Sequence, residues 1–182
     1  TFGKPTSTIH VTGNSTLAMF DCNSSSTIPS VQNATDIDKG KKLTFRAGSR
    51  CKVQGSLLGQ GTYSISFPYV RGDVYTNCSK FEGVYEVASG QWRLRQAVDL
   101  SKATLQLGAG VYAAGYSSDK NEGSYTHKIG SLTSRASDCT LSTGVWNVGY
   151  LSEDGTYAGT FNASATLNKY GEGRLTLTGA SA

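Results

Sequence analysis

Short runs of alternating apolar and polar residues recur along the chain, with turn residues between them. Alternation with a period of two puts one set of side chains in a core and the other in water, which is typical of a β-strand. Only residues 94–103 could hold a helical turn, and Asp99 and Ser101 weaken a helix there. The pattern predicts strands at residues 8–11, 17–20, 42–46, 62–67, 84–87, 91–95, 103–107, 110–114, 125–129, 145–148, 160–163 and 174–178.

Strands without helices predict an all-β fold, an antiparallel β-sandwich of the immunoglobulin-like or jelly-roll type with little helix. Residues 23–40 are rich in Ser, Asn and Asp without clear periodicity, and we expect a long loop there. One domain spans residues 1–178, and residues 179–182 begin a linker to a second domain or form a frayed tail. The expected core contains Trp92, Trp146, Leu43, Phe45, Ile65, Phe67, Leu105 and Leu177.

Composition narrows the class of protein. The 182 residues include 17 Lys and Arg against 13 Asp and Glu, which gives a net charge of +4. So mild a charge does not by itself indicate a nucleic-acid partner. No run of about 18 apolar residues predicts a membrane-spanning helix. We therefore expect a globular domain that binds neither nucleic acid nor membrane.

Four cysteines, Cys22, Cys51, Cys78 and Cys139, occur without a Cys-X-X-Cys pair and with only two histidines. An even number in this arrangement predicts two disulfides rather than a metal site or a redox motif. Cys22 and Cys51 flank the expected loop and Cys78 with Cys139 is the natural second pair, but three connectivities are possible. Disulfides place the chain outside a reducing cytosol, so we expect a secreted, extracellular protein. We also expect no cofactor.

A basic stretch runs from residue 39 to residue 52 without an acidic residue. Alternation puts Lys42 and Arg46 on one face of a strand, and Arg93 and Arg95 share a face in the same way. Such faces could bind sulfated or sialylated glycans or an acidic protein segment. The alternative is a solvated edge that protects a sheet against unwanted pairing. The residues of this basic patch are Lys39, Lys41, Lys42, Arg46, Arg50 and Lys52.

Two groups of aromatic and Asp or Asn residues occur in turn-rich segments and are candidate glycan-binding loops. An aromatic ring stacks on a sugar ring while neighbouring Asp and Asn side chains bind its hydroxyls. The alternative is that Tyr is simply a favourable strand residue. Residues 71–73 also match the integrin-binding tripeptide Arg-Gly-Asp, although three residues carry little information. The candidate ligand-binding residues are Tyr116, Asp119, Asn121 and Tyr125 in one group, and Asp73, Tyr75 and Asn77 in the other.

Signals of catalysis are weak. His10 and His127 are the only histidines, and no Gly-X-Ser-X-Gly nucleophile motif is present. A glycoside hydrolase needs two carboxyl groups across a cleft, whereas Glu82 and Glu86 would lie on one strand. We therefore predict no catalytic residue and no enzyme activity.

The layout of Cys22, Cys51 and the terminal segment 173–182 resembles the receptor-binding, lectin-like domain of a chaperone–usher pilus tip adhesin. The resemblance implies an elongated, disulfide-stapled β-sandwich that is exported and joined by a short linker to a pilin domain. The chain does not open with the pocket-forming residue of the mannose-specific members, so mannose specificity is not implied.

These observations together predict an extracellular adhesin domain of a cell-surface fimbrium. It would bind a host glycan, or a matrix or plasma protein, through loops at one end of a rigid sandwich. One alternative is a secreted jelly-roll glycoside hydrolase. The other is a structural or interaction protein such as a pilus subunit, a viral surface domain or a fungal effector.

Overall fold

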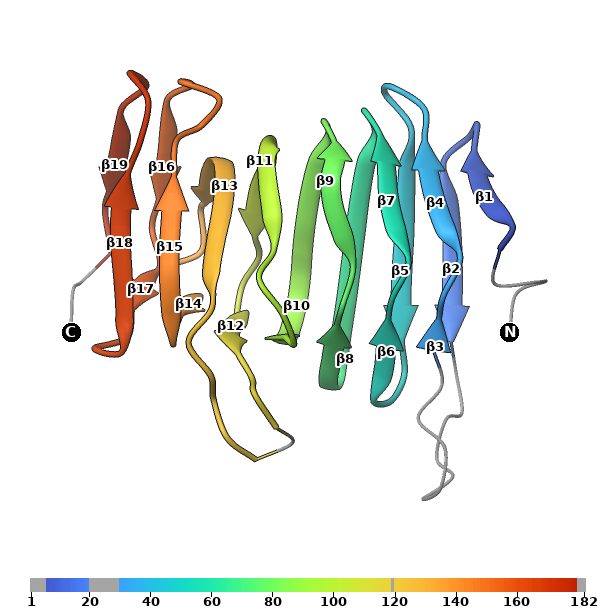
Figure 1. Ribbon diagram of the computed structural model, residues 1–182, viewed down its shortest axis with the longest axis horizontal. Helices are drawn as coiled ribbons and strands as arrows, with labels where there is room; N and C mark the ends of the chain where they lie inside the picture. The colour runs from blue at the N-terminus through green and yellow to red at the C-terminus, as the bar shows by residue number, and fades with distance from the viewer. Residues whose placement is uncertain (1–5, 20–29, 119, 180–182) are drawn as a thin grey trace.

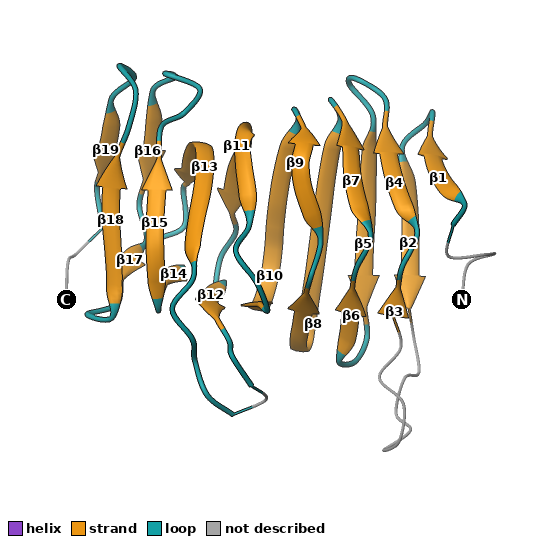
Figure 2. Ribbon diagram, viewed as in Figure 1, coloured by secondary structure: helices purple, strands orange, loops and turns teal. Residues whose placement is uncertain are grey.

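In the computed structural model, which describes residues 6–19, 30–118 and 120–179, the strands stack side by side along the longest axis of the molecule (Figure 1). All strand pairs in this stack are parallel, and each turn of the chain adds one rung to it. The described residues contain no helix (Figure 2), and hence none long and apolar enough to cross a membrane. The architecture is a parallel β-solenoid.

The pairing register divides the strands into three faces. The first face contains β1 (Thr8–Val11), β4 (Ala34–Ile37), β7 (Ser56–Gly59), β9 (Asn77–Phe81), the starts of β11 (Asp99–Leu107) and β13 (Thr126–Ser134), β15 (Gly144–Val148) and β18 (Ala165–Lys169). The second face contains β2 (Ser15–Met19), β5 (Lys42–Ala47), the starts of β8 (Thr62–Val74) and β10 (Val84–Leu94), the ends of β11 and β13, β16 (Gly155–Tyr157) and β19 (Leu175–Leu177). The third face contains β3 (Ser30–Val31), β6 (Cys51–Val53), the ends of β8 and β10, β12 (Tyr112–Gly115), β14 (Thr140–Leu141) and β17 (Thr160–Phe161).

The core is built from columns of like residues on successive rungs. On the second face Leu43, Tyr63, Tyr85 and Leu105 are register partners, and each is at most 5% exposed. The rings of Tyr63 and Tyr85 lie 5.4 Å apart in an edge-to-face arrangement. Each large apolar side chain buried in this way contributes about 1.5–3 kcal/mol, so alternation within each strand stabilises the whole stack.

The corner between the second and third faces depends on a close approach. A Cβ at Gly72 would lie 2.0 Å from Cζ of the buried Phe67 ring. Glycine is therefore required where the ring packs against the β8 backbone. This contact helps β8 to continue from one face to the next.

The predicted antiparallel β-sandwich is wrong, although an all-β fold with little helix was expected. A chain usually needs a helical crossover to return to a parallel neighbour. Here the chain returns through the two other faces instead of a helix. Each strand therefore pairs with the strand of the same face on the next turn of the solenoid. Strands of the first face begin at residues 8, 34, 56, 77, 99, 126, 144 and 165, at intervals of 26, 22, 21, 22, 27, 18 and 21 residues. So irregular a repeat hides the solenoid in the sequence.

The predicted disulfides are also wrong for the cysteines that can be placed. Cys51, Cys78 and Cys139 are buried, and no two of them are bonded to each other. Cys78 and Cys139 lie two to three rungs apart, which is on the order of 10 Å at about 4.8 Å per rung, whereas a disulfide needs Cα atoms within about 7 Å. The other expected pair includes Cys22, which lies outside the described residues.

Seven of the eight predicted core residues are buried. The exception is Leu177, which is 50% exposed because β19 pairs on one side only, with β16. The expected long loop instead contains β3 and β4, and its residues 23–29 lie outside the described part.

Candidate functional site

Outward side chains of the third face form a regular grid. Cys51, Gly72, Trp92 and Ala113 are register partners that point inward. Because side chains alternate, the residues on either side of each partner point outward on successive rungs. These outward positions place five basic side chains around one carboxylate, a group that we call the arginine cluster: Arg50, Lys52, Arg71, Arg93 and Arg95 around Asp73.

Asp73 is the centre of the arginine cluster and is fully buried. Its Oδ2 accepts hydrogen bonds from Arg50 Nη2 at 2.7 Å and Arg50 Nε at 3.0 Å. Its Oδ1 accepts one from Arg95 Nε at 2.9 Å, and Arg93 Nε lies 3.6 Å away. Charge-assisted bonds of this kind are short and directional, so Asp73 holds the guanidinium groups in place.

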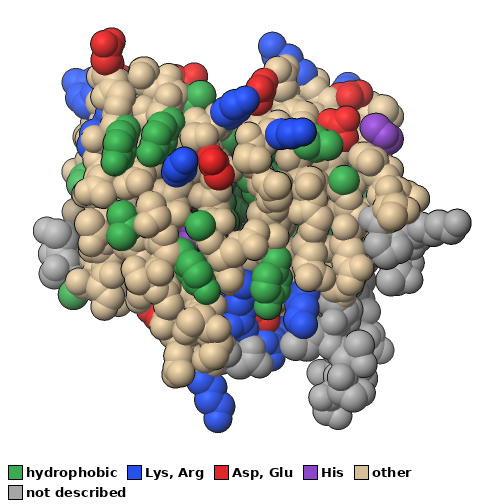
Figure 3. Space-filling view, in the orientation of Figure 1, with side chains coloured by type: hydrophobic (Ala, Val, Ile, Leu, Met, Phe, Trp, Pro, Cys, Tyr) green, Lys and Arg blue, Asp and Glu red, His purple; other side chains and the backbone are tan. Residues whose placement is uncertain are grey.

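Cations outnumber carboxylates among the described residues of the arginine cluster. Five basic side chains surround one carboxylate, that of Asp73. Burial lowers the pKa of Arg93; Asp73 opposes this effect, and Arg71 and Arg95 add to it. Arg71 Nε is buried and has no hydrogen-bond partner within the described residues. Figure 3 shows Lys and Arg side chains gathered around acidic atoms on the lower side of the molecule, where the third face lies.

Tyr116 covers part of the arginine cluster. Its ring lies over the guanidinium of Arg93, with Cζ 3.9 Å from the ring centroid, and is only 8% exposed. Its hydroxyl accepts a hydrogen bond from Gln91 Nε2 at 2.8 Å. Arg93 Nη2 also donates to the backbone carbonyl of Ser118 at 3.2 Å. Arg93 is therefore held flat between its own sheet and the chain above it.

The segment that carries Tyr116, residues 116–118 and 120–125, is fastened by Glu122. The hydroxyl of Tyr112 donates to Glu122 Oε1 at 2.6 Å, and Ser142 and Thr143 donate to Glu122 Oε2. Burial raises the pKa of Glu122, but these hydrogen bonds outweigh it and hold that pKa below its ordinary value. An ionised Glu122 thus fixes the segment at the rim and lowers the local excess charge by one.

The structure brings together residues from all three sequence-predicted groups. Asp73 from one group, Tyr116 from another, and Arg50 and Lys52 from the basic patch all belong to this site. Tyr75 lies two residues beyond Asp73, at the next outward position, and its carbonyl accepts a hydrogen bond from Gln96. These residues lie together on the third face and not on loops at one end of the molecule.

The other predicted ligand-binding residues lie away from the cluster. Asn77 accepts hydrogen bonds from the backbone and hydroxyl of Ser79. Asn121 is exposed on the segment fastened by Glu122, and Tyr125 packs edge-on against His127. Asp119 lies outside the described residues. The Arg-Gly-Asp tripeptide offers no accessible carboxylate, because Asp73 is buried.

The six basic-patch residues do not share one surface. Lys39 and Lys41 lie at the corner between the first and second faces. Lys42 and Arg46 point outward on the second face, where Lys42 Nζ lies 2.7 Å from Glu86 Oε2. The edge-protection alternative does not hold for β5, because β5 pairs with both β2 and β8.

Sequence reasoning missed the contributions of Arg71 and Gln91. A usable signal was present, because Arg50, Arg71, Gln91 and Tyr112 follow one another at intervals of 21, 20 and 21 residues. Two residues after each of them comes another outward residue, as in Arg71-Gly72-Asp73. The period becomes visible only when the polar positions are aligned by rung.

No group of three or more His, Cys, Asp or Glu side chains in the described ranges is placed to hold a metal ion. No protein-family model matches this chain, and neither a curated protein nor a solved structure shows significant similarity to it. Nothing in these comparisons points to an adhesin, a pilus or secretion. The resemblance to pilus tip adhesins is one of architecture, and it loses the antiparallel sandwich on which it depends.

Proposed function

We propose that this β-solenoid is a glycan-binding protein whose arginine cluster recognises a sulfate group of an acidic polysaccharide. The observation that carries the proposal is Arg71: its half-buried side chain lies beside the guanidinium of Arg93 and has neither a hydrogen-bond acceptor nor a counter-ion among the described residues. A bound anion would pair with the Arg71 guanidinium and offset its repulsion with Arg93.

The identity of the basic residues favours a sulfate group. Guanidinium groups are weakly hydrated and present planar donors that match an oxyanion. A sulfate ester offers three terminal oxygens, enough for donors that converge from two rungs. Arg71 and Lys52 are half-buried and Arg50 is 23% exposed, so they are the members that an incoming anion can reach.

The geometry favours recognition over turnover. Asp73 is enclosed by guanidinium groups and is not available as an acid or base. Glu122, the carboxylate at the rim, is occupied by hydrogen bonds from Tyr112, Ser142 and Thr143. A rigid, pre-formed cluster is instead suited to binding, because little freedom is lost when the ligand arrives.

The direct test is a calorimetric titration with sulfated dextran oligosaccharides and with unsulfated dextran of the same length. We expect the sulfated form alone to bind, with an affinity that falls as ionic strength rises. Arg71→Gln should weaken binding about tenfold or more, because a hydrogen bond to a charged group contributes about 1.5–3 kcal/mol.

Arg46→Gln is the matched control, because it removes the same charge from an exposed position on the second face. Equal loss in the two variants would mean non-specific attraction and would contradict the proposal. Stronger binding of an acidic peptide such as poly-glutamate than of sulfated dextran would also contradict it. Binding to a matrix or plasma protein and a neighbouring pilin domain stay predictions. The extracellular location also stays a prediction, and the expected Cys78–Cys139 disulfide no longer supports it.

A further inference from the structure

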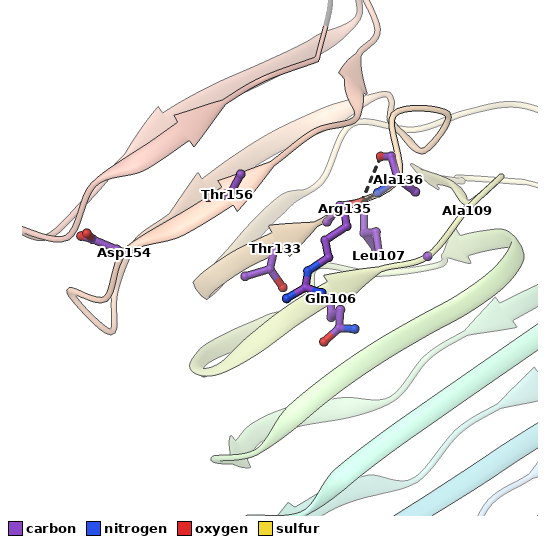
Figure 4. A pocket seen from close by; sticks show the side chains of 10 residues that line it. Gln106, Leu107, Ala109, Thr133, Arg135, Ala136, Asp154 and Thr156 are labelled. Carbon is purple, nitrogen blue, oxygen red and sulfur yellow. Dashed lines mark hydrogen bonds between the residues drawn. The ribbon is translucent and has the colours of Figure 1, made fainter.

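A groove of about 770 Å³ lies on the second face, away from the arginine cluster (Figure 4). It follows the ends of β11 and β13 and the start of β16. Its outward polar side chains come from three successive rungs and include Gln106, Thr133 and Thr156. In Figure 4, Arg135 extends towards Gln106, while Asp154 lies at the opposite rim.

On earlier rungs of the same face, several outward polar side chains are paired with one another. Lys42 Nζ donates to Glu86 Oε2 at 2.7 Å, and the hydroxyls of Ser66 and Ser89 lie 2.8 Å apart. In the groove, by contrast, the side chains of Gln106, Thr133 and Thr156 make no hydrogen bond to any described residue. Donors and acceptors that converge on a hollow without partners in the protein are available to a ligand.

One of the two charged side chains in the groove has no ion-pair partner among the described residues. No carboxylate among the described residues lies within 4 Å of the Arg135 guanidinium. The carboxylate of Asp154 instead accepts a hydrogen bond from the backbone of Arg174 at 2.8 Å and lies 3.6 Å from its guanidinium. The groove thus presents one unpaired cation beside hydroxyl and amide groups.

We propose that this groove is a second binding site, which takes a uronate residue of an acidic polysaccharide. Arg135 would bind the carboxylate through a two-pronged contact, and Thr133, Thr156 and Gln106 would bind ring hydroxyls. Three rungs at about 4.8 Å each span about 10 Å, which suits two or more sugar units lying along the solenoid axis. The site requires nothing from the arginine cluster.

The test is a titration of the protein with oligogalacturonate and with its methyl ester. Binding is measured by calorimetry and by changes in the amide NMR signals of the groove residues. Oligogalacturonate should bind and shift the signals of Gln106, Thr133 and Thr156, and the ester should bind at least tenfold more weakly. Arg135→Gln should weaken binding about tenfold, and Thr133→Val by several fold. Arg46→Gln, on the same face, should have no effect.

Absence of binding at millimolar oligogalacturonate, or equal binding of the ester, would overturn the proposal. Equal loss in Arg135→Gln and Arg46→Gln would overturn it as well. Loss of oligogalacturonate binding in Arg71→Gln but not in Arg135→Gln would assign the ligand to the arginine cluster instead. Because sulfated dextran has no carboxylate, failure of this site and failure of the proposed function are separate results.

Discussion

The arginine cluster and the second-face groove are made of the same parts and differ in burial. Both use outward side chains on successive rungs of one solenoid. In the cluster, Asp73 and Arg93 are at most 1% exposed, and the Tyr116 ring lies over Arg93. In the groove, Arg135, Asp154 and Thr156 are exposed. Because the arginine cluster is buried, its charges contribute to the stability of the fold. Side chains of the exposed groove can be substituted with little effect on stability.

The difference shows how a solenoid can acquire function. Its rungs fix the spacing of outward positions, and the segments between rungs decide which positions are closed to water. Desolvation strengthens the attraction between charges but makes an unpaired charge costly. We therefore expect substitutions in the cluster to affect both folding and binding, and substitutions in the groove to affect binding alone.

The largest expected effect is that of Asp73→Asn. Removing the carboxylate breaks the buried ion pairs of Asp73 with Arg93 and Arg95, which should lower the free energy of unfolding by about 3–5 kcal/mol. Asp154→Asn is the matched substitution in the groove, where the side chain is 67% exposed, and it should change stability by about 0.5 kcal/mol or less. Urea unfolding followed by circular dichroism measures both. Similar losses in the two variants would break the comparison.

One buried histidine extends the contrast between buried and exposed polar groups. His127 is fully buried, its Nδ1 accepts the Val98 amide, and burial lowers its pKa from 6.5 to about 4. Below pH 6.5 the unfolded chain therefore takes up a proton that the folded chain does not. Stability should fall by about 3 kcal/mol between pH 6.5 and 4.

This pH dependence is measured by unfolding across that range. It should disappear in His127→Phe, even though that variant loses the Val98 hydrogen bond at every pH. A flat profile for the wild type, after the carboxylate contribution is subtracted with the His127→Phe curve, would contradict the account.

Tyrosines allow a third comparison. Tyr116→Ala removes the ring over Arg93 and should cost about 2 kcal/mol, because the cation–π contact is desolvated. Tyr150 stacks on Tyr170 with centroids 5.0 Å apart, but both rings are exposed. Tyr150→Ala should therefore cost only about 0.5 kcal/mol. Thermal unfolding should separate the two variants clearly, and a larger loss for Tyr150→Ala would refute the role given to the cover.

The smallest expected effect concerns the ion pair of Lys42 and Glu86 on the second face. The Lys42 side chain is 45% exposed, so water weakens the attraction. A double-mutant cycle with Lys42→Ala and Glu86→Ala should give a coupling energy of about 0.5 kcal/mol. Arg135→Ala, which breaks no ion pair among the described residues, should leave stability within about 0.5 kcal/mol of the wild type. A coupling energy above that of the buried Asp73–Arg95 pair would reverse the order proposed here.

Strand content could be predicted from the sequence, but strand partners could not. Residues 42–46 and 62–67 alternate clearly because they carry large apolar side chains, and both lie within strands of the second face. β7 and β9 were missed because their short segments contain Ser, Gly and Asn. Alternation says which side of a strand is buried but not which strand lies beside it, so antiparallel and parallel sheets look alike.

The site was partly predictable for the same reason. Asp73 and Tyr116 were identified as polar and aromatic positions with binding potential, but as the tips of two separate loops. Asp73 instead lies inside β8, and Tyr116 lies on the neighbouring outward column two rungs later. Their proximity is a property of the repeat, which only the three-dimensional stack reveals.

The most direct measurement of the central claim is a titration of sulfated dextran oligosaccharides into the wild type, Arg71→Gln and Arg135→Gln under identical salt conditions. The account predicts that Arg71→Gln loses about tenfold or more in affinity while Arg135→Gln binds like the wild type. Unchanged binding in Arg71→Gln, or the same loss in both variants, would show that the arginine cluster does not bind the sulfate group.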